Sequence, residues 1–492
     1  MLLLIVLLPI LAATAILAGA PTRKTALGAS VAMLLLTLFA FVEYEPWRRG
    51  FQYVISFPIL PEWHLSFSLG LDGLSLTMVL LAAIVTVAAV WFTGKIDKYE
   101  RAFYACLLFI SGGAIGAFAS LDLFFFYAFH ELALIPTFLL IGIWGSGDRV
   151  AAAWKITIYL ALGSFVLLLG LILLYQNLPV ALRTFYIPDL KRSIGQIPPD
   201  AQRNIFLLLL IGFGTLISLF PFHSWAPEAY ASAPAPAAML HAGVLKKFGL
   251  YGLLRLAVPL LPEGARYWSG LLIVLLLGNI IYIGLVTIAQ KKLDWMLGYS
   301  SVMHMGYIFL GIASANLLGT IGAATLMFAH GLSIALLFAV AGEIRKRTGT
   351  LDFQKLGGLA KTMPFAGLAF GFAAFAAIGL PGFANFAAEI MVFFSAFRNG
   401  WEMSRFHTFQ IATVLALWGV VISAVYMLRA YRNVFMGQPN EHQNAIVDLR
   451  TSLRLPVAML VATLLVFGFF PQYLVDVVAP TFRNYFTTAQ TP

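Results

Sequence analysis

The sequence predicts an all-α polytopic membrane protein with about 14 transmembrane helices. The chain has 492 residues, of which 61% are hydrophobic and 11% charged, and its mean hydropathy is +0.90. Soluble domains average about 45–50% apolar and about 25% charged residues. A transmembrane helix needs about 20 apolar residues, so spans of that length account for most of the chain. This composition excludes a soluble enzyme, a nucleic-acid-binding module and a disordered chain.

Apolar windows, separated by charges and by Pro/Gly clusters, give the expected helices in order. The windows cover residues 2–20, 26–42, 72–93, 102–119, 121–143, 153–176, 204–222, 236–261, 268–289, 295–314, 317–342, 364–397, 409–435 and 455–479. Two windows are expected to be discontinuous, one near Pro221 and one near Pro381. Backbone groups freed at membrane depth need protein or a wet cavity around them, so such breaks indicate ion or substrate sites.

The two broken helices fall in two long halves of the chain, each with an acidic residue inside an apolar run. This pattern predicts a duplicated core that forms an inverted repeat. We therefore expect three N-terminal helices in residues 1–101, a first five-helix repeat in 102–261, a second in 268–435, and a C-terminal helix with a tail in 455–492.

The distribution of Lys and Arg predicts the orientation of the chain. No basic residue precedes the first apolar window, whereas Arg23 and Lys24 follow it, which favours an uncleaved helix over a signal peptide. Lys and Arg are more frequent in the loops assigned to the inner side, and an even number of helices then places both termini outside, which is the periplasm in a bacterium. Cys106 is the only cysteine, so disulfides and cysteine-ligated Fe–S clusters are not expected within this chain.

Ionisable residues inside apolar windows are the candidate functional residues, because a charge at the bilayer centre costs about 2.5–3.5 kcal/mol. Glu131, Lys247 and Glu389 each occupy such a position. A carboxyl or amino group in apolar surroundings can exchange protons near neutral pH, so these residues predict proton transfer. The structural alternative for Glu131 is a carboxylate locked in a helix–helix ion pair. Lys246 and Lys247 point about 100° apart on a helix, so we expect one to face the interior while the other snorkels or meets a neighbouring helix.

Histidines and one further lysine extend this set. His330 lies in the middle of an apolar window, and His223, His241 and His304 lie within or beside others. Histidine can relay protons through either ring nitrogen, whereas the dispersed spacing of these residues is a poor match to a metal site. Lys155 opens its window on the inner side, where snorkelling or function would each explain it. Together the Glu, Lys and His residues predict a proton-conducting axis.

Five ordered motifs resemble those of a known family, the antiporter-like membrane subunits of respiratory complex I and of multisubunit cation/proton antiporters. The motifs are SLDLF (120–124), PFHSWAPEA (221–229), YSSVMHMG (299–306), AHGLS (329–333) and PGFANFAAE (381–389). The resemblance covers nearly the whole chain and implies an antiporter-like core. Glu389 stands where subunit M of bacterial complex I, the counterpart of mitochondrial subunit 4, carries glutamate, while subunits L and N carry lysine.

The resemblance implies a proton-transfer role for each candidate residue. By position, the matches are Glu131 to the fifth-helix glutamate, Lys155 to a sixth-helix lysine, Lys247 to the eighth-helix lysine, His304 to the histidine of the tyrosine–serine–serine motif, His330 to a histidine of the central axis, and Glu389 to the twelfth-helix charge. These residues would pair and unpair as protons move.

The chain departs from the family at two positions. Leu216 stands where a seventh-helix lysine normally pairs with the fifth-helix glutamate, and Tyr230 stands where a histidine is usual. Either another group such as Lys155 substitutes for the missing lysine, or proton transfer in this chain is altered or lost.

By resemblance, the chain is expected to move protons in the membrane arm of an NADH–quinone oxidoreductase, driven by quinone reduction elsewhere in the complex. No cofactor is expected on this chain, and NADH, FMN, Fe–S clusters and quinone are expected in partner subunits. The expected partners are subunits L and N, the hydrophilic redox arm and lipids, without nucleic acid, in the bacterial inner membrane. The alternatives are a subunit of a sodium/proton antiporter, a subunit of a hydrogenase-type complex, and a structural relic that holds a membrane arm together.

Overall fold

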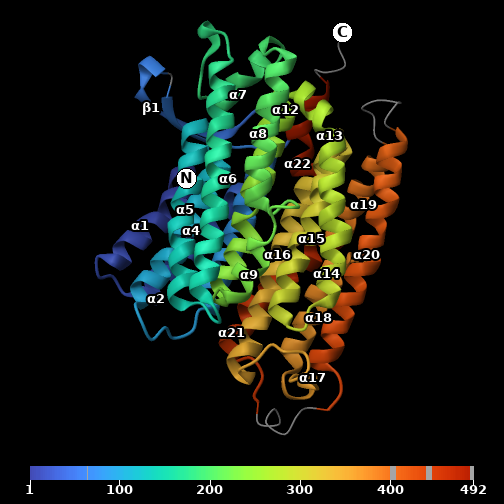
Figure 1. Ribbon diagram of the computed structural model, residues 1–492. Coiled ribbons are helices and arrows are strands. Elements are labelled where there is room, and N and C mark those ends of the chain that lie inside the picture. The colour runs from blue at the N-terminus through green and yellow to red at the C-terminus, as the bar shows by residue number, and fades with distance from the viewer. Residues whose placement is uncertain (64, 399–405, 439–445, 488–492) are drawn as a thin grey trace.

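The computed structural model describes residues 1–63, 65–398, 406–438 and 446–487, which form an upright bundle of helices (Figure 1). Within these residues, eleven helices are long and apolar enough to cross a membrane. They are α2 (Thr22–Val42), α3 (Gly73–Phe92), α4 (Glu100–Ala119), α5 (Leu123–Trp144), α6 (Arg149–Gln176), α8 (Pro199–Ile217), the continuous run of α13 (Pro262–Leu277) and α14 (Gly284–Ala289), α15 (Leu293–Ala313), α16 (Leu317–Thr348), α20 (Phe406–Phe435) and α21 (Thr451–Phe469).

Shorter helices complete the remaining crossings. They are α1 (Leu2–Leu17), α9 (Trp225–Ser232), α10 (Ala235–Leu240), α11 (Lys247–Gly252), α12 (Val258–Leu260), α18 (Pro364–Ile378), α19 (Ala384–Phe397) and α22 (Gln472–Thr487), with α7 (Ile187–Leu190) and α17 (Leu359–Thr362) in loops. The π-helical turns His241–Leu245 and Leu253–Ala257 join α10, α11 and α12 into one crossing. The prediction of an all-α membrane protein with about 14 crossings is confirmed.

Two discontinuous crossings lie where the sequence predicts them. α8 ends at Ile217 and the chain resumes as α9, while α18 ends at Ile378 and the chain resumes as α19. At the first break, Asn279 accepts the Phe220 N–H (2.7 Å) and donates to the carbonyl oxygens of Ser218 (3.1 Å) and Val302 (2.9 Å). The freed backbone groups are therefore paired inside the protein, as membrane depth requires.

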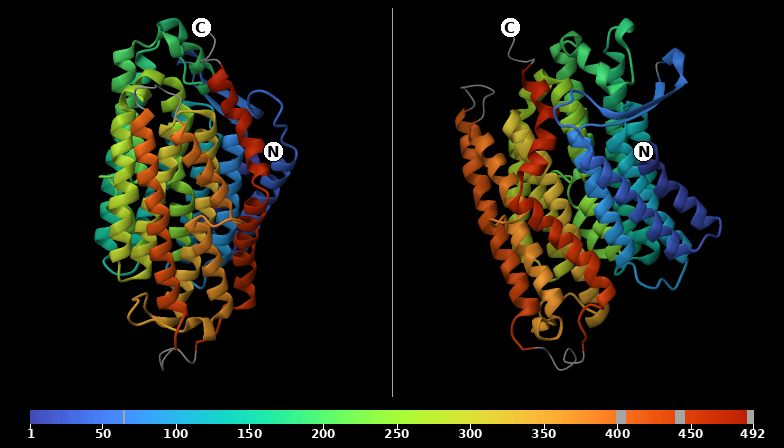
Figure 2. Two further views of the ribbon diagram at one scale, coloured as in Figure 1. Left: turned by 90° about the vertical axis from the view of Figure 1, so that its right-hand side faces the viewer. Right: turned by 180° about the vertical axis from the view of Figure 1, so that it is seen from behind.

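Two elements differ from the expected windows. β1 (Gln52–Leu60) and β2 (Leu65–Leu71) pair antiparallel in a hairpin between α2 and α3 (Figure 1). β2 alternates apolar with small residues, which is the period of a strand, but this short run is hidden among long apolar windows. The last window is not continuous, because the chain breaks at Pro471, which cannot continue α21. α22 then rises beyond it to the upper end of the bundle (Figure 2).

The most deeply buried helices are α3 and α16, whose apolar stretches are covered on all sides. α16 packs against α3, α10, α15, α18 and α19, so residues from both halves of the chain meet along it. The helix has 32 residues, or about 48 Å at 1.5 Å per residue, which exceeds the roughly 30 Å hydrocarbon core. Its middle therefore lies at membrane depth, while its last turn carries Arg345, Lys346 and Arg347 beyond it.

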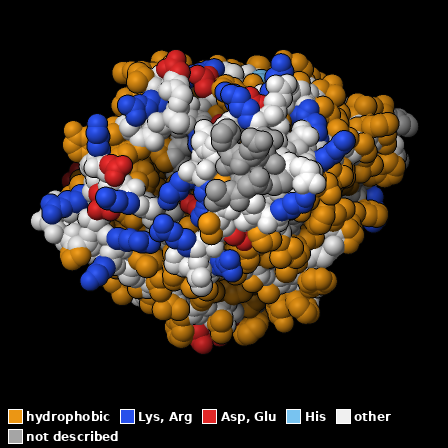
Figure 3. All heavy atoms as spheres, turned by 90° about the horizontal axis from the view of Figure 1, so that it is seen from below, with side chains coloured by type: hydrophobic (Ala, Val, Ile, Leu, Met, Phe, Trp, Pro, Cys, Tyr) orange, Lys and Arg blue, Asp and Glu red, His pale blue; other side chains and the backbone are white. Residues whose placement is uncertain are grey.

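Lys and Arg gather on the lower end of the bundle, which Figure 3 shows from below. The surface there is rich in basic side chains, with apolar side chains around the rim. α22 reaches the opposite, upper end, and α1 begins in the upper half of the bundle (Figure 1). A basic face at one end is the pattern that sets the orientation of membrane proteins.

Candidate functional site

Lys247 and His330 form a hydrogen-bonded pair in the middle of the bundle. Lys247, on α11, is fully buried, and its Nζ lies 2.9 Å from Nδ1 of His330 on α16. The same Nζ donates to the Ala242 carbonyl (2.8 Å), which the π turn leaves accessible because the Lys246 N–H bonds to His241 instead. An ammonium can donate to a neutral imidazole, and a neutral amine can accept from an imidazolium. The pair can therefore pass a proton with little movement.

His304, on α15, extends this arrangement toward the second broken helix. Its ring centroid lies 5.5 Å from that of His330. Nδ1 lies 2.8 Å from the Ser300 carbonyl and Nε2 lies 2.7 Å from the Ala377 carbonyl, one residue before the end of α18. An imidazole with one N–H satisfies one of these carbonyls, and a doubly protonated ring satisfies both. The ring thus ties α15 to the break in the second half.

Glu389, on α19, lies beside that break. The residue is buried, and its Oε1 has no hydrogen-bond partner among the described residues. Gly379 has φ of 78°, and a Cβ at this position would overlap Glu389 Oε2, so glycine makes room for the carboxyl group. The Tyr307 hydroxyl is likewise buried without a partner among the described residues, and its ring lies edge-on to His304 with centroids 5.7 Å apart. We call Lys247, His330, His304, Tyr307 and Glu389 the central row.

Glu131 lies apart from the central row. Its side chain is 36% exposed on the surface of α5, rather than enclosed as its apolar surroundings in sequence suggested. The carboxylate accepts a hydrogen bond from Ser164 Oγ and lies 3.5 Å from His130 Nδ1. His130 is buried, and its ring stacks on that of Phe248 with 4.0 Å between centroids. Phe248 directly follows Lys247 in the chain. His130 therefore lies between Glu131 and the residue that follows Lys247, a placement that the sequence does not predict.

Lys155 pairs with Glu228, not with Glu131. Its Nζ donates to Glu228 Oε2 at 2.7 Å, and both side chains are partly exposed. Among the described residues, Glu131 has no Lys or Arg within ion-pair distance. Leu216 left open whether Lys155 replaces the missing lysine as the partner of Glu131. In the structure Lys155 does not pair with Glu131. Glu228 belongs to a family motif, but only the fold reveals its pairing with a residue on α6.

Lys246 is buried as deeply as Lys247 but points elsewhere. Its Nζ lies 3.5 Å from both the carbonyl and the hydroxyl oxygen of Ser301 on α15, and 5.6 Å from the centre of the Tyr230 ring. It therefore meets a neighbouring helix, which is one of the two expected outcomes for this residue. Tyr230 in turn shares a 3.2 Å hydrogen bond with His241 Nδ1. Two lysines, a tyrosine and a histidine are thus brought together around the π turn.

A buried ion pair closes the upper end of this region. Arg255 donates to both carboxylate oxygens of Asp72 (2.5 and 2.6 Å), and Asp72 caps α3 by accepting from the Ser75 N–H (3.0 Å). Burial alone would raise the pKa of Asp72, but the Arg255 guanidinium and the cap hydrogen bond lower it below its usual value. Asp72 therefore stays ionised and holds α3 against the crossing that carries both lysines. Within the described residues, no three His, Cys, Asp or Glu side chains gather as a metal site would require.

The fold and the central row define a class of protein, the polytopic antiporter-like membrane subunits. The family described as NADH:quinone oxidoreductase/Mrp antiporter, TM, matches residues 120–416, and the chain belongs to this family. NAD(P)H-quinone oxidoreductase chain 4 2 of Synechococcus sp. (strain JA-3-3Ab) is 36% identical to it, over 92% of this chain and 84% of the relative. NADH-quinone oxidoreductase subunit M of Rickettsia prowazekii (strain Madrid E) is 32% identical, over 91% and 89%.

Solved structures agree with these relatives. A chain of respiratory complex I from Thermus thermophilus with bound NADH matches with a TM-score of 0.88 and 28% identity, over 99% of both chains. A chain of the Mrp complex from Dietzia sp. DQ12-45-1b matches with a TM-score of 0.84 and 22% identity, over 99% of this chain and 97% of that one. The second likeness supports the fold alone. The predicted family and its antiporter-like architecture are confirmed.

Proposed function

We propose that the chain is the proton-translocating subunit of the membrane arm of an NADH–quinone oxidoreductase, corresponding to subunit M. The observation that carries this proposal is the central row, in which titratable side chains of both halves follow one another through the buried middle of the bundle. Moving one charge against 100 mV takes about 2.3 kcal/mol, so the proton affinity of a relay residue must change by roughly two pKa units. Changes of this size are within reach of buried groups that gain or lose a partner.

Within this proposal each site residue has a role. Lys247 and His330 exchange a proton, His304 passes it toward the second break, and Glu389 is the acceptor at the end of the row. Glu131 acts from the edge through His130, whose ring stacks on Phe248, the residue after Lys247. Lys155 and Glu228 form a partly exposed pair that can open and close as the charge of the row changes.

Two substitutions test the proposal in the assembled complex. We expect Lys247→Ala and Glu131→Gln to abolish proton pumping while NADH oxidation and assembly persist. Protons translocated per NADH oxidised, measured in inverted membrane vesicles, give the readout, with assembly checked on native gels. Lys291→Ala, at an exposed lysine, is the control and should pump normally. Normal pumping by an assembled Lys247→Ala complex would remove the central row from the mechanism.

We also propose that the partners are subunits L and N together with a hydrophilic arm that holds NADH, FMN, Fe–S clusters and quinone, in the bacterial inner membrane with both termini on the periplasmic side. The names of the relatives and the basic lower face support these assignments. The matching family includes Mrp antiporters as well, which supports a cation/proton antiporter as the second candidate. Gentle purification of the tagged chain, followed by mass spectrometry, separates them. Recovery of redox subunits with the chain favours the NADH–quinone oxidoreductase. Recovery of polytopic membrane proteins alone favours the cation/proton antiporter.

A further inference from the structure

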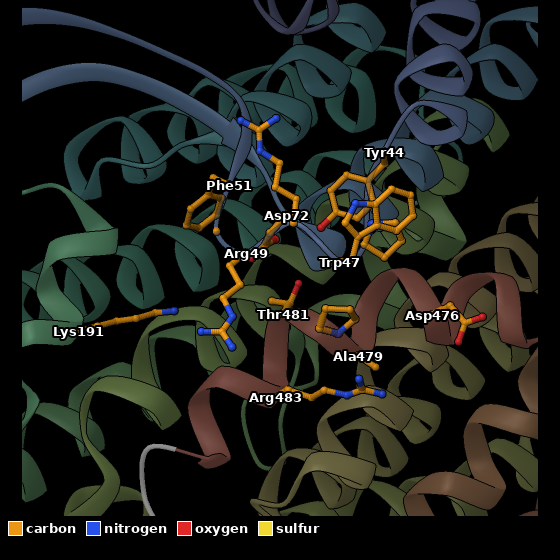
Figure 4. A pocket seen from close by; sticks show the side chains of 14 residues that line it. Tyr44, Trp47, Arg49, Phe51, Asp72, Lys191, Asp476, Ala479, Thr481 and Arg483 are labelled. Atoms are coloured by element: carbon orange, nitrogen blue, oxygen red, sulfur yellow. The ribbon is translucent and has the colours of Figure 1, made fainter.

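A cavity of about 670 Å³ opens at the upper end of the bundle, away from the central row. It lies where the loop between α2 and β1 meets α22 and the turn that follows α7 (Figure 4). Sites for small ligands typically enclose about 300–1,000 Å³, so this cavity is large enough for one headgroup-sized molecule. None of its residues takes part in the proton-transfer arrangement described above.

Cationic side chains outnumber carboxylates in the walls of the cavity. Four cationic side chains line it from three separate segments, and only two carboxylates do. The cations are Arg48, Arg49, Lys191 and Arg483, and the carboxylates are Asp72 and Asp476. Asp72 is already held by Arg255 through two hydrogen bonds. In Figure 4, Arg49 and Lys191 extend toward the same end of the cavity, while Asp476 lies at the other end. This end is suited to an anion that can accept several hydrogen bonds.

Aromatic and apolar side chains place the cavity at the boundary between membrane and water. Trp47 is 79% exposed and Tyr44 is buried in the cavity wall. Aromatic rings of this kind concentrate at the headgroup level of membranes. Burial raises the pKa of Tyr44, so its hydroxyl stays neutral and can donate a hydrogen bond.

An apolar surface leads from the cavity into the membrane. The C-terminal ends of α2 and α21 meet, where the rings of Phe41 and Phe467 pack edge-to-face with centroids 6.5 Å apart. The neighbouring ends of these two helices expose Phe39, Val42 and Phe469. A molecule seated in the cavity could therefore place apolar chains against the bundle while its charged end stays among the cations.

We propose that this cavity binds the phosphate-bearing headgroup of an anionic phospholipid, with its acyl chains along α2 and α21. Arg49 can donate paired N–H groups to the phosphate, and Lys191, which extends toward the same end of the cavity, adds a second cation. The bound lipid would join the α2–β1 loop to α22. α22 already lies against the start of α3, since a Cβ at Gly73 would overlap the Val477 carbonyl. The lipid would thus stabilise the docking of α22.

Photolabelling of the whole complex in vesicles tests this site. The complex is reconstituted in phosphatidylcholine with a minor fraction of photoactivatable phosphatidylglycerol, and labelled peptides are mapped by mass spectrometry. We expect labelling of the α2–β1 loop and of α22, with about a fivefold fall for each cation removed. The double variant Arg49→Gln/Lys191→Gln should therefore lose at least about tenfold. Arg203→Gln removes a cation stacked on Tyr267 at the start of α8 and should leave the labelling unchanged.

Several outcomes would overturn the lipid site. Equal labelling by photoactivatable phosphatidylcholine would mean that no headgroup is selected. Loss of labelling when soluble glycerol phosphate is added would indicate a site for free phosphate. Unchanged labelling in the double variant, or crosslinks from this cavity to another polypeptide, would also contradict the proposal. If the double variant does not assemble, Arg49→Gln alone, at an exposed loop residue, decides the question with its expected fivefold fall.

Discussion

The two broken helices share a backbone geometry. α8 is followed by Ser218 and α18 by Gly379, and both of these capping residues have left-handed φ, 72° and 78° respectively. In each break, the N–H of the next residue donates to the carbonyl five residues back, at 2.7 Å in the first and 3.1 Å in the second. The same capping bond thus closes both half-helices.

Their polar surroundings are different. At the first break Asn279 makes three hydrogen bonds to backbone groups, and the nearby Leu216 is apolar. At the second break, Glu389 Oε1, the Tyr307 hydroxyl and both polar atoms of the Asn385 side chain are buried without a partner among the described residues. Buried polar atoms are almost always hydrogen-bonded, so we expect water at the second break. The first break also leaves Ser218 Oγ and His223 Nδ1 buried without a partner among the described residues, so the feature that sets the second break apart is the buried carboxyl group of Glu389.

The largest expected effect is on proton pumping, which should depend on the second break and not on the first. Glu389→Gln removes the only carboxyl group of the central row and should abolish proton pumping by the assembled complex. Leu216→Met keeps an apolar side chain of similar volume at the first break, which usually costs less than about 1.5 kcal/mol, and should leave pumping unchanged. Protons translocated per NADH oxidised provide the measurement. Wild-type pumping in the Glu389→Gln complex would mean that the second break is as passive as the first.

A second pair of substitutions compares the two asparagines. Asn279→Leu removes three hydrogen bonds to backbone groups, among them those of the Phe220 N–H and the Ser218 carbonyl at the break, and should destabilise the chain by about 2–4 kcal/mol. Asn385→Leu breaks no hydrogen bond to a described residue, so its effect on stability should be much smaller, while proton pumping should slow. Thermal unfolding of the purified complex and pumping assays report the two effects. Equal loss of stability in both variants would show that Asn385 is as firmly bonded as Asn279.

The sequence predicts the breaks and the ionisable candidates for a physical reason. Pro221 and Pro381 interrupt long apolar windows, and proline cannot continue a regular helix. A charged Lys247 or Glu389 at membrane depth costs enough free energy to indicate a function. Uncharged polar residues leave no such signal. Tyr307 lies in a long apolar window, where its hydroxyl hardly changes the hydropathy.

Pairings between distant segments could not be predicted. Lys155 and Glu228 meet because α6 packs against α9, and Asp72 meets Arg255 only once α3 has docked. The partial exposure of Glu131 likewise depends on which face of α5 the neighbouring helices leave uncovered. Such facts follow from packing in three dimensions, which periodicity along one helix does not determine.

The next comparison concerns the stability cost of a side chain at Ser218 and Gly379, the two residues with left-handed φ at the breaks. Gly379→Ala should cost about 2 kcal/mol, because a side chain is strained at this φ and its Cβ would overlap the Glu389 carboxyl group. Ser218→Gly should be nearly neutral, since it relieves the same strain at the first break but adds freedom to the unfolded chain. Melting temperatures of the two complexes measure the difference. Because only Gly379→Ala displaces Glu389, it alone should also lower pumping, and a loss of pumping in Ser218→Gly would contradict the passive role of the first break.

The smallest expected effect concerns the start of the helices in each half. Asp122 caps α5, where it accepts from the N–H groups of Phe124 (2.9 Å), Phe125 (3.4 Å) and Ser66 (3.4 Å), whereas α15 in the second half has no side-chain cap. Burial raises the pKa of Asp122 to about 6, although these hydrogen bonds lower it. An unfolded aspartate has a pKa of about 3.9. The stabilising contribution of Asp122 is therefore complete below about pH 4 and is lost as the pH rises through about 6.

Asp122→Asn tests whether stability falls as the pH rises, because an amide oxygen can accept the same hydrogen bonds without titrating. Relative to the variant, the wild-type complex should become less stable between pH 5 and pH 7.5, by about 1 kcal/mol after allowance for screening. Melting temperatures of both complexes at these two pH values give the comparison. Parallel pH dependences would show that the Asp122 carboxyl group is as well solvated in the folded chain as in the unfolded one. The cap of the first half would then be no more sensitive to pH than the uncapped start of α15.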